Sequence, residues 1–86
     1  MTIIDFEKVI VEKESFNEKE NYYVIDRYII TDKSVMYYFK IYHNEEDKKE
    51  ARYIKVSNDP IYRIFPKEKV LRSLLDRDFY VVKVCQ

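Results

Sequence analysis

The side chains that could carry out acid–base chemistry are few. Arginine, lysine, tyrosine and histidine are sufficient for a metal-free ribonuclease, and Arg27, Tyr38, Lys40 and His43 offer that set. His43 is the single histidine, and it ends an expected strand beside an acidic segment. That position is more typical of a surface residue than of a general base, so ribonuclease activity is the least favoured hypothesis.

Glycine is absent from all 86 residues. Phosphate-binding loops, dinucleotide-binding fingerprints and nucleophile elbows all require glycine, so the sequence excludes them. Zinc needs three or four ligands, whereas the chain has one histidine and one cysteine, Cys85. Cys85 fits an apolar residue of an edge strand better than a nucleophile. We predict a protein that is not an enzyme and has no metal and no cofactor.

Length and charge limit the class of protein further. With 86 residues the chain should form a single domain, 1–86, around one modest core. Its 16 basic and 16 acidic residues cancel, which argues against a surface devoted to DNA and against an acidic DNA mimic. The sequence shows neither a signal-peptide pattern nor an apolar run of membrane-spanning length. We therefore expect a reducing, cytoplasmic location and no membrane partner.

Residue patterns predict mostly strands. The β-branched run Val9-Ile10-Val11 favours a strand over residues 2–14, with a helix as the alternative. Further strands are expected at 22–31, 34–43, 50–57 and 79–85. Turns are expected at 15–21, 32–33 and 58–60, and a charged loop at 44–49.

One helix is expected, over residues 67–77. Pro66 suits a helix start, and Val70, Leu71, Leu74 and Leu75 form one apolar stripe. The predicted order is therefore β-β-β-β-α-β. It indicates a small two-layer α+β domain, in which one helix covers a mainly antiparallel sheet of four to six strands.

Turn positions also predict which residues face each other. If residues 32–33 and 44–49 close two hairpins, Phe39 lies opposite Asp26 and Ile54, and Tyr37 lies opposite Tyr28. This face should pack on the helix. On that face, Asp26 should form an ion pair with Arg52 across the sheet, and the alternative is a carboxylate that lines a pocket.

The opposite face should be rich in tyrosine and cations, and it is the main candidate site. Its proposed binding residues are Arg27, Tyr38, Lys40, Tyr42, Tyr53 and Lys55. Three interpretations remain open: ordinary sheet surface, a protein-binding surface rich in tyrosine and arginine, and a platform for single-stranded nucleic acid. A second basic patch, either a solvated surface or a contact for phosphate or an acidic partner, is expected at Arg63, Lys67, Lys69 and Arg72.

Among these functions the sequence favours a non-enzymatic protein-binding module. The chain is rich in Ile, Lys and Tyr and has a single alanine, Ala51, as in AT-rich coding sequences of low-GC bacteria and their phages. The specific hypothesis is a small phage-type inhibitor or modulator of a host protein. Single-stranded nucleic-acid binding, through the same face and the basic helix, is the alternative. A homodimer through an edge strand is a further option.

Overall fold

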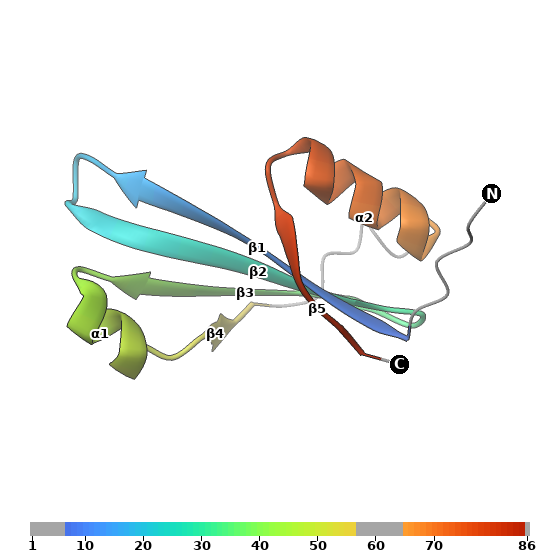
Figure 1. Ribbon diagram of the computed structural model, residues 1–86, viewed down its shortest axis with the longest axis horizontal. Helices are drawn as coiled ribbons and strands as arrows, with labels where there is room; N and C mark the ends of the chain where they lie inside the picture. The colour runs from blue at the N-terminus through green and yellow to red at the C-terminus, as the bar shows by residue number, and fades with distance from the viewer. Residues whose placement is uncertain (1–6, 57–64, 86) are drawn as a thin grey trace.

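The computed structural model describes residues 7–56 and 65–85 and shows a five-stranded antiparallel sheet with two helices (Figure 1). The strand order across the sheet is β4-β3-β2-β1-β5. The elements in chain order are β1 (Lys8–Asn17), β2 (Tyr22–Thr31), β3 (Val35–Tyr42), α1 (Glu45–Glu50), β4 (Ile54–Lys55), α2 (Lys67–Asp76) and β5 (Tyr80–Cys85). The predicted α+β class with an antiparallel sheet is confirmed.

Most predicted elements are present close to their expected bounds. The first segment is a strand that runs from Lys8 to Asn17, so the turn expected at 15–21 is shorter and covers 18–21. Residues 2–6 of the predicted strand lie outside the described residues. The register is also confirmed: Asp26 pairs with Phe39, and Phe39 pairs with Ile54. It follows from a two-residue turn, in which the Thr31 amide donates to the Ser34 carbonyl at 2.9 Å.

Two predictions between residues 44 and 57 were wrong. The expected charged loop is the helix α1, because the Asn44 side chain caps it by accepting from the Asp47 amide at 2.9 Å. Three acidic residues in its first turn and two lysines in its last turn also match the helix dipole. The strand expected at 50–57 is only Ile54–Lys55 in the structure, and Glu50 is the last residue of α1. Residue 57 and the turn expected at 58–60 lie outside the described residues.

The core joins α2 to one end of the sheet. Val70 and Leu74 of α2 pack on buried side chains of β1, β2 and β3 and on Phe79, and the full cluster is Val9, Val11, Ile30, Val35, Val70, Leu74 and Phe79. A helix of ten residues spans only ~15 Å, whereas the molecule is 42 Å long. Figure 1 shows α2 above one end of the sheet and α1 below the other end.

The face that was expected to pack on the helix is therefore only partly covered. Tyr28 packs against the core, as predicted. Further along the same face, Ile41 is 42% exposed and Ile54 is 56% exposed. The expectation that the whole face is buried was wrong, because α2 is too short to reach these residues.

Two residues take the role that glycine has in other proteins. Asn21 and Asp78 have positive φ angles of 57° and 70°, and Asn and Asp tolerate this left-handed conformation best after glycine. Asp78 follows α2, where the Asp78 amide donates to the Leu75 carbonyl and the Phe79 amide donates to the Leu74 carbonyl. This pair of bonds is a Schellman motif, which turns the chain from α2 into β5.

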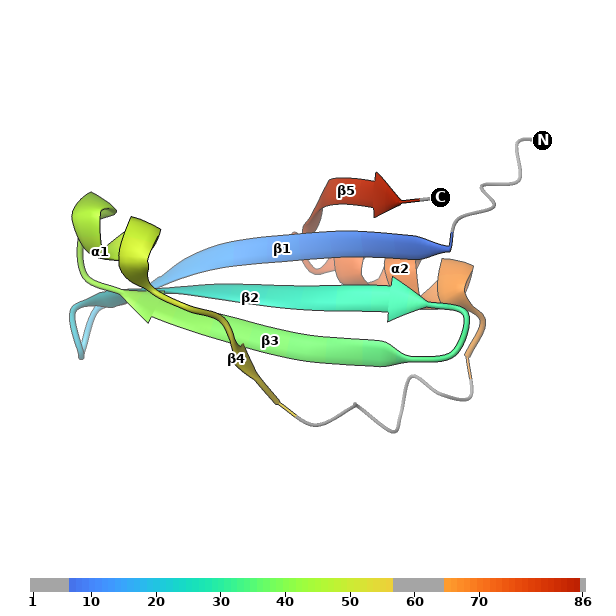
Figure 2. The same ribbon diagram turned by 90° about the horizontal axis from the view of Figure 1, so that it is seen from below.

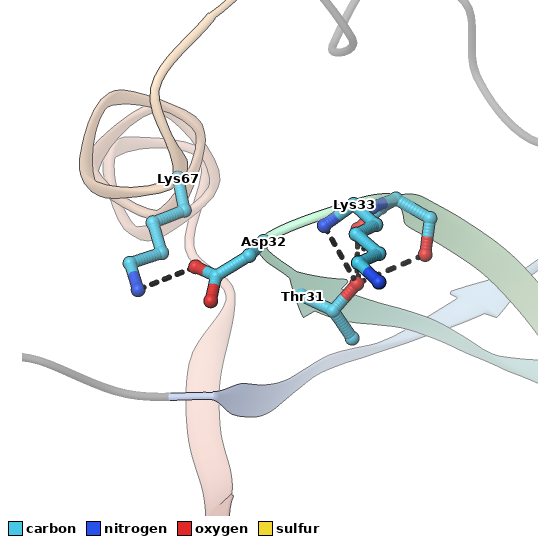
Figure 3. A network of polar contacts seen from close by, with 5 residues as sticks. Thr31, Asp32, Lys33 and Lys67 are labelled. Atoms are coloured by element: carbon cyan, nitrogen blue, oxygen red, sulfur yellow. Dashed lines mark hydrogen bonds and ion pairs between the residues drawn. The ribbon is translucent and has the colours of Figure 1, made fainter.

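The start of α2 is tied to the β2–β3 turn. Figure 3 shows Lys67, the first residue of α2, reaching Asp32 in that turn, with Nζ 2.6 Å from Oδ1. The Thr31 hydroxyl accepts from the Lys33 and Ser34 amides and holds the turn. Lys67 thus has a structural partner on the sheet.

We expect Leu74→Ala to lower the free energy of unfolding by about 2–5 kcal/mol, because the Leu74 side chain is fully buried. Leu75→Ala is the matched control on the same helix. Since Leu75 is 42% exposed, its loss should be below about 1 kcal/mol. Urea unfolding of both variants measures the difference, and equal losses would contradict the packing described above.

Asp78→Gly should stabilise the protein by about 1 kcal/mol, because glycine adopts a positive φ without steric cost and the substitution removes a negative charge from a helix C-terminus. Asp78→Ala is the control, since it removes the charge but keeps the Cβ. Thermal unfolding should rank Asp78→Gly above both the wild type and the alanine variant. The opposite ranking would show that the Asp78 side chain stabilises the turn.

Candidate functional site: the aromatic face of the sheet

The face of the sheet opposite α2 is called the aromatic face here. Pairing places Glu12, Arg27, Tyr38 and Lys55 in one row across four strands, and residues directly opposite each other share a face. A second row contains Phe16, Tyr23 and Tyr42. Figure 2 views this side of the sheet, with α1 and β4 in front and α2 behind.

A buried carboxylate lies at the centre of the aromatic face. Glu12 is 7% exposed, and its Oε2 accepts from Arg27 Nε at 2.5 Å and from the Tyr53 hydroxyl at 2.9 Å. The Arg27 guanidinium also lies over the Tyr53 ring, 3.8 Å from its centroid. Burial of a carboxylate is unfavourable unless it is paired and hydrogen-bonded. This cluster supplies both, and its contacts with Glu12 and Arg27 hold the Tyr53 side chain in place.

A row of three rings lies towards the β1–β2 hairpin. The centroids of Phe16 and Tyr23 are 4.7 Å apart, and Tyr23 stacks on Tyr42 at 5.1 Å with an angle of 11° between the rings. Tyr42 is only 2% exposed, and its hydroxyl donates to Glu14. Lys48 of α1 lies 3.5 Å from Glu14 and 5.4 Å from the Tyr42 ring centroid. The helix α1 therefore closes one end of the face over Tyr42.

Three tyrosine hydroxyls, two on the aromatic face and one on the helix side of the sheet, donate hydrogen bonds to carboxylates. Burial, reinforced by the hydrogen bond to Glu12, raises the pKa of Tyr53 to about 12. Burial and the hydrogen bond to Glu14 raise the pKa of Tyr42 further above its usual value. On the helix side, burial and the hydrogen bond to Asp26 do the same to the pKa of Tyr37. These hydroxyls therefore stay protonated and keep donating up to strongly alkaline pH.

The structure brings part of the predicted site together. Arg27, Lys40 and Tyr53 meet, since Lys40 Nζ is 5.0 Å from the Tyr53 ring centroid. Tyr38 is half-buried in the row that also contains Lys55, which is exposed. Tyr42 is buried within the row of rings, so its ring presents little surface to a partner.

Sequence reasoning missed three residues of this face, Glu12, Glu14 and Phe16. All three come from β1, which was expected to be a strand but was never aligned with β2. Pairing across residues 18–21 would have placed Phe16 opposite Tyr23 and Glu12 opposite Arg27. The consequence is electrostatic: acidic side chains lie among the cations of a face that was expected to be basic.

The predicted ion pair between Asp26 and Arg52 was wrong. Asp26 accepts a hydrogen bond from the Tyr37 hydroxyl, and within the described residues no ion pair joins it to Arg52, which is exposed. The alternative prediction, a carboxylate that lines a pocket, matches the structure. Asp26 lines a cleft of about 200 Å³ at the end of α2 with Lys13, Ser15, Tyr28, Tyr37, Arg77 and Phe79.

The second basic patch is reduced in the structure. Arg63 lies outside the described residues. Lys67 is paired with Asp32, while Lys69 lies over the Phe65 ring at 5.1 Å and Arg72 is exposed. Lys67, Lys69 and Arg72 belong to α2, which lies on the far side of the sheet from the aromatic face (Figure 2).

The candidate ribonuclease residues do not converge. His43 follows β3, where its Nδ1 lies 3.2 Å from the Asn21 carbonyl oxygen. His43 lies five positions after Tyr38, a distance of roughly 17 Å along a strand. Cys85 is half-buried. In the described ranges no group of three or more His, Cys, Asp or Glu residues is placed to hold a metal ion.

Comparisons with known proteins identify no relative. No family model, no curated protein and no solved structure matches the chain. Across residues 7–56 and 65–85, neither helix has the length and apolar character needed to cross a membrane.

We expect Glu12→Gln to lower the pKa of Tyr53 from about 12 towards its usual value of 10, because the amide carries no negative charge. A tyrosine whose pKa is raised on folding stabilises the protein fully below pH 10, and this contribution is lost as the pH rises to about 12. The wild type should therefore lose more stability over that window than the variant. Glu18→Gln, an exposed residue in the β1–β2 turn, is the charge-matched control.

NMR titration of labelled tyrosine rings gives the pKa of Tyr53, and urea unfolding at pH 7 gives the stability. At that pH Glu12→Gln should cost about 1–3 kcal/mol, because it weakens charge-assisted hydrogen bonds in a partly exposed cluster. A Tyr53 pKa that is equal in the wild type and both variants would contradict the role given to Glu12.

Proposed function

We propose that this protein is a non-enzymatic protein-binding module that recognises its partner through the aromatic face. The observation that carries this proposal is the cluster at Glu12. Its carboxylate pairs with Arg27 and accepts from Tyr53, which neutralises the cation at the centre of the face and holds the Tyr53 ring in place. An aromatic centre in which the buried charge is paired is typical of protein interfaces.

The anchors for a partner are Phe16 and Tyr23. They are 46% and 37% exposed, and their rings are in contact. Tyr23 also rests on the buried Tyr42, so a partner would meet side chains that are already ordered. Binding then costs little side-chain entropy, which favours affinity. Tyr38, Lys40 and Lys55 extend the surface towards β4 and add hydrogen-bonding and positively charged groups.

The charge distribution favours protein over single-stranded nucleic acid. A nucleic-acid platform needs cations that are free to contact phosphates. On the aromatic face Arg27 is neutralised by Glu12 and Lys48 lies beside Glu14, so Lys40 and Lys55 are the cations of the proposed site left to contact phosphates, which is few for such a platform. Lys69 and Arg72 belong to α2, on the other side of the sheet (Figure 2), so a strand bound to the aromatic face would not reach them.

The partner that we propose is a host protein, and the role is that of an inhibitor or modulator. The AT-rich type of composition and the small size fit a phage-encoded chain of this kind. A compact module with one rigid recognition face is suited to covering a site on a larger protein.

Phe16→Ala and Tyr23→Ala should each weaken partner binding at least tenfold, about 1.4 kcal/mol, because each removes an exposed aromatic anchor. The partner is first isolated by pull-down from host lysate, with and without nuclease and at low and high salt. Affinities of purified variants are then measured by calorimetry. Ile54→Ala is the control, since Ile54 is an exposed apolar residue on the opposite face.

A protein captured after nuclease treatment and at high salt, and released by the Phe16 and Tyr23 variants, is the expected result. Capture of nucleic acid, with a steep salt dependence and losses at Lys40→Ala and Lys55→Ala, would replace the proposal by the nucleic-acid alternative. A partner that binds both aromatic variants as tightly as the wild type would remove the aromatic face from the proposal. Circular dichroism of each variant confirms that it is folded.

A further inference from the structure

The strand β5 is an apolar edge of the sheet. In the described part of the chain β5 has one neighbour, β1, and it ends the strand order (Figure 2). Its residues Tyr80, Val81, Val82 and Val84 are 43–51% exposed, and its one charged side chain is Lys83. An exposed apolar edge strand is a template for pairing with another strand, because its outer amides and carbonyls have no partner in the sheet.

Pairing with β1 shows which way the side chains of β5 point. Val84 lies opposite Val9, and Val81 lies opposite Val11. Both β1 residues belong to the core beneath α2, so Val81 and Val84 lie on the helix side of the sheet. Tyr80, Lys83 and Cys85 lie opposite Glu12, Ile10 and Lys8. These three therefore lie on the aromatic side.

A β-bulge makes this arrangement possible. The register shifts between Ile10 and Val11, and Val82 has no partner of its own in β1. Without the extra residue, Val81 and Val84 would point to opposite sides of the sheet. With it, they point to the same side, three positions apart.

We propose that β5 pairs with the β5 strand of a second copy of this chain, antiparallel, about a two-fold axis between residues 82 and 83. Val81 then lies opposite the second copy's Val84, and Tyr80 lies opposite its Cys85. Each pair shares one side of the sheet, as opposed residues must. The two five-stranded sheets become continuous, and the valine pairs extend the apolar layer of Val9 and Val11.

The side on which each β5 residue lies also favours this register over the two registers that are shifted by one residue. An axis through Val82 would oppose Tyr80 and Val84, which point to different sides of the sheet. An axis through Lys83 would place this lysine opposite its own copy, and like charges in direct opposition destabilise a sheet. In the proposed register Lys83 faces Val82, so no two charges of β5 are opposed.

Two properties, the sequence of β5 and the net charge of the protein, favour a second copy of this chain as the partner of the β5 edge. The apolar edge complements itself under two-fold symmetry, as a homodimer interface must. The formal net charge of the chain is zero, so two copies meet no long-range repulsion. The competing interpretation is that Lys83 and the bulge protect a monomeric edge, since proteins use both devices for that purpose.

The mass in solution, measured by light scattering over a range of concentrations, tests the pairing. The wild type should reach twice the 10.6 kDa of one chain. The double variant V81K/V84K should remain at 10.6 kDa at every concentration, because it opposes two pairs of lysines. V81K/V84E adds equally polar side chains but opposes lysine to glutamate twice, so it should dimerise again.

Three results would overturn the proposal. A wild type that stays at 10.6 kDa at all concentrations shows that the edge is protected. A dimer that survives V81K/V84K lies elsewhere on the surface. A dimer that V81K/V84K abolishes and V81K/V84E does not restore uses another register. Circular dichroism shows whether each variant is folded, and both substituted side chains are already 43% or more exposed.

A cross-link tests the register by a second route. Tyr80→Cys should form a disulfide from position 80 of one copy to Cys85 of the other under mild oxidation. Positions 80 and 85 of one strand are roughly 16 Å apart, so they cannot join within a chain. Tyr80→Cys combined with Cys85→Ser is the control and should stay monomeric on a non-reducing gel. Equal cross-linking in both would contradict the proposed pairing.

Discussion

The structure depends on one constraint: the ten-residue helix α2 is too short to cover the whole length of the sheet. The apolar core forms only where Val70 and Leu74 of α2 meet β1, β2 and β3. Beyond that end no second apolar layer covers the sheet within residues 7–56 and 65–85, so its strands there are stabilised by contacts between side chains on the same face. The rest of the molecule is organised by this need.

On the aromatic face, ion pairs, hydrogen bonds and ring contacts stabilise the sheet in place of an apolar core. Glu12 is buried in a pair with Arg27 and a hydrogen bond from Tyr53, and Tyr42 is held by Glu14 and covered by α1. A buried carboxylate of this kind adds less stability than an apolar side chain of the same size, but it restricts how its partners can be arranged. The same side-chain contacts that stabilise the sheet also order the surface that we propose for recognition, with Phe16 and Tyr23 at its exposed end.

Much of the fold could be predicted from local sequence, and the failures have physical causes. The register of β2 and β3 follows from a two-residue turn and from alternating side chains, both of which are local. The helix α1 was missed because its stability comes from the Asn44 cap and from charges at its ends, while it buries no apolar residue. Asp26 was assigned the wrong partner because the sequence does not show that the Tyr37 hydroxyl reaches it first.

The sequence by itself determined the strands β1, β2, β3 and β5 and the helix α2, the antiparallel pairing of β2, β3 and β4, and the side of the sheet on which each residue of these three strands lies. These properties depend on backbone preference and on a side-chain period of two, which act over a few residues. Only the tertiary structure decided that β5 lies beside β1 and forms an open apolar edge, and that the carboxylates of Glu12 and Glu14 meet Arg27 and the Tyr42 hydroxyl. Strand neighbours that are distant in sequence are selected by the packing of the whole domain, and no local pattern records that choice.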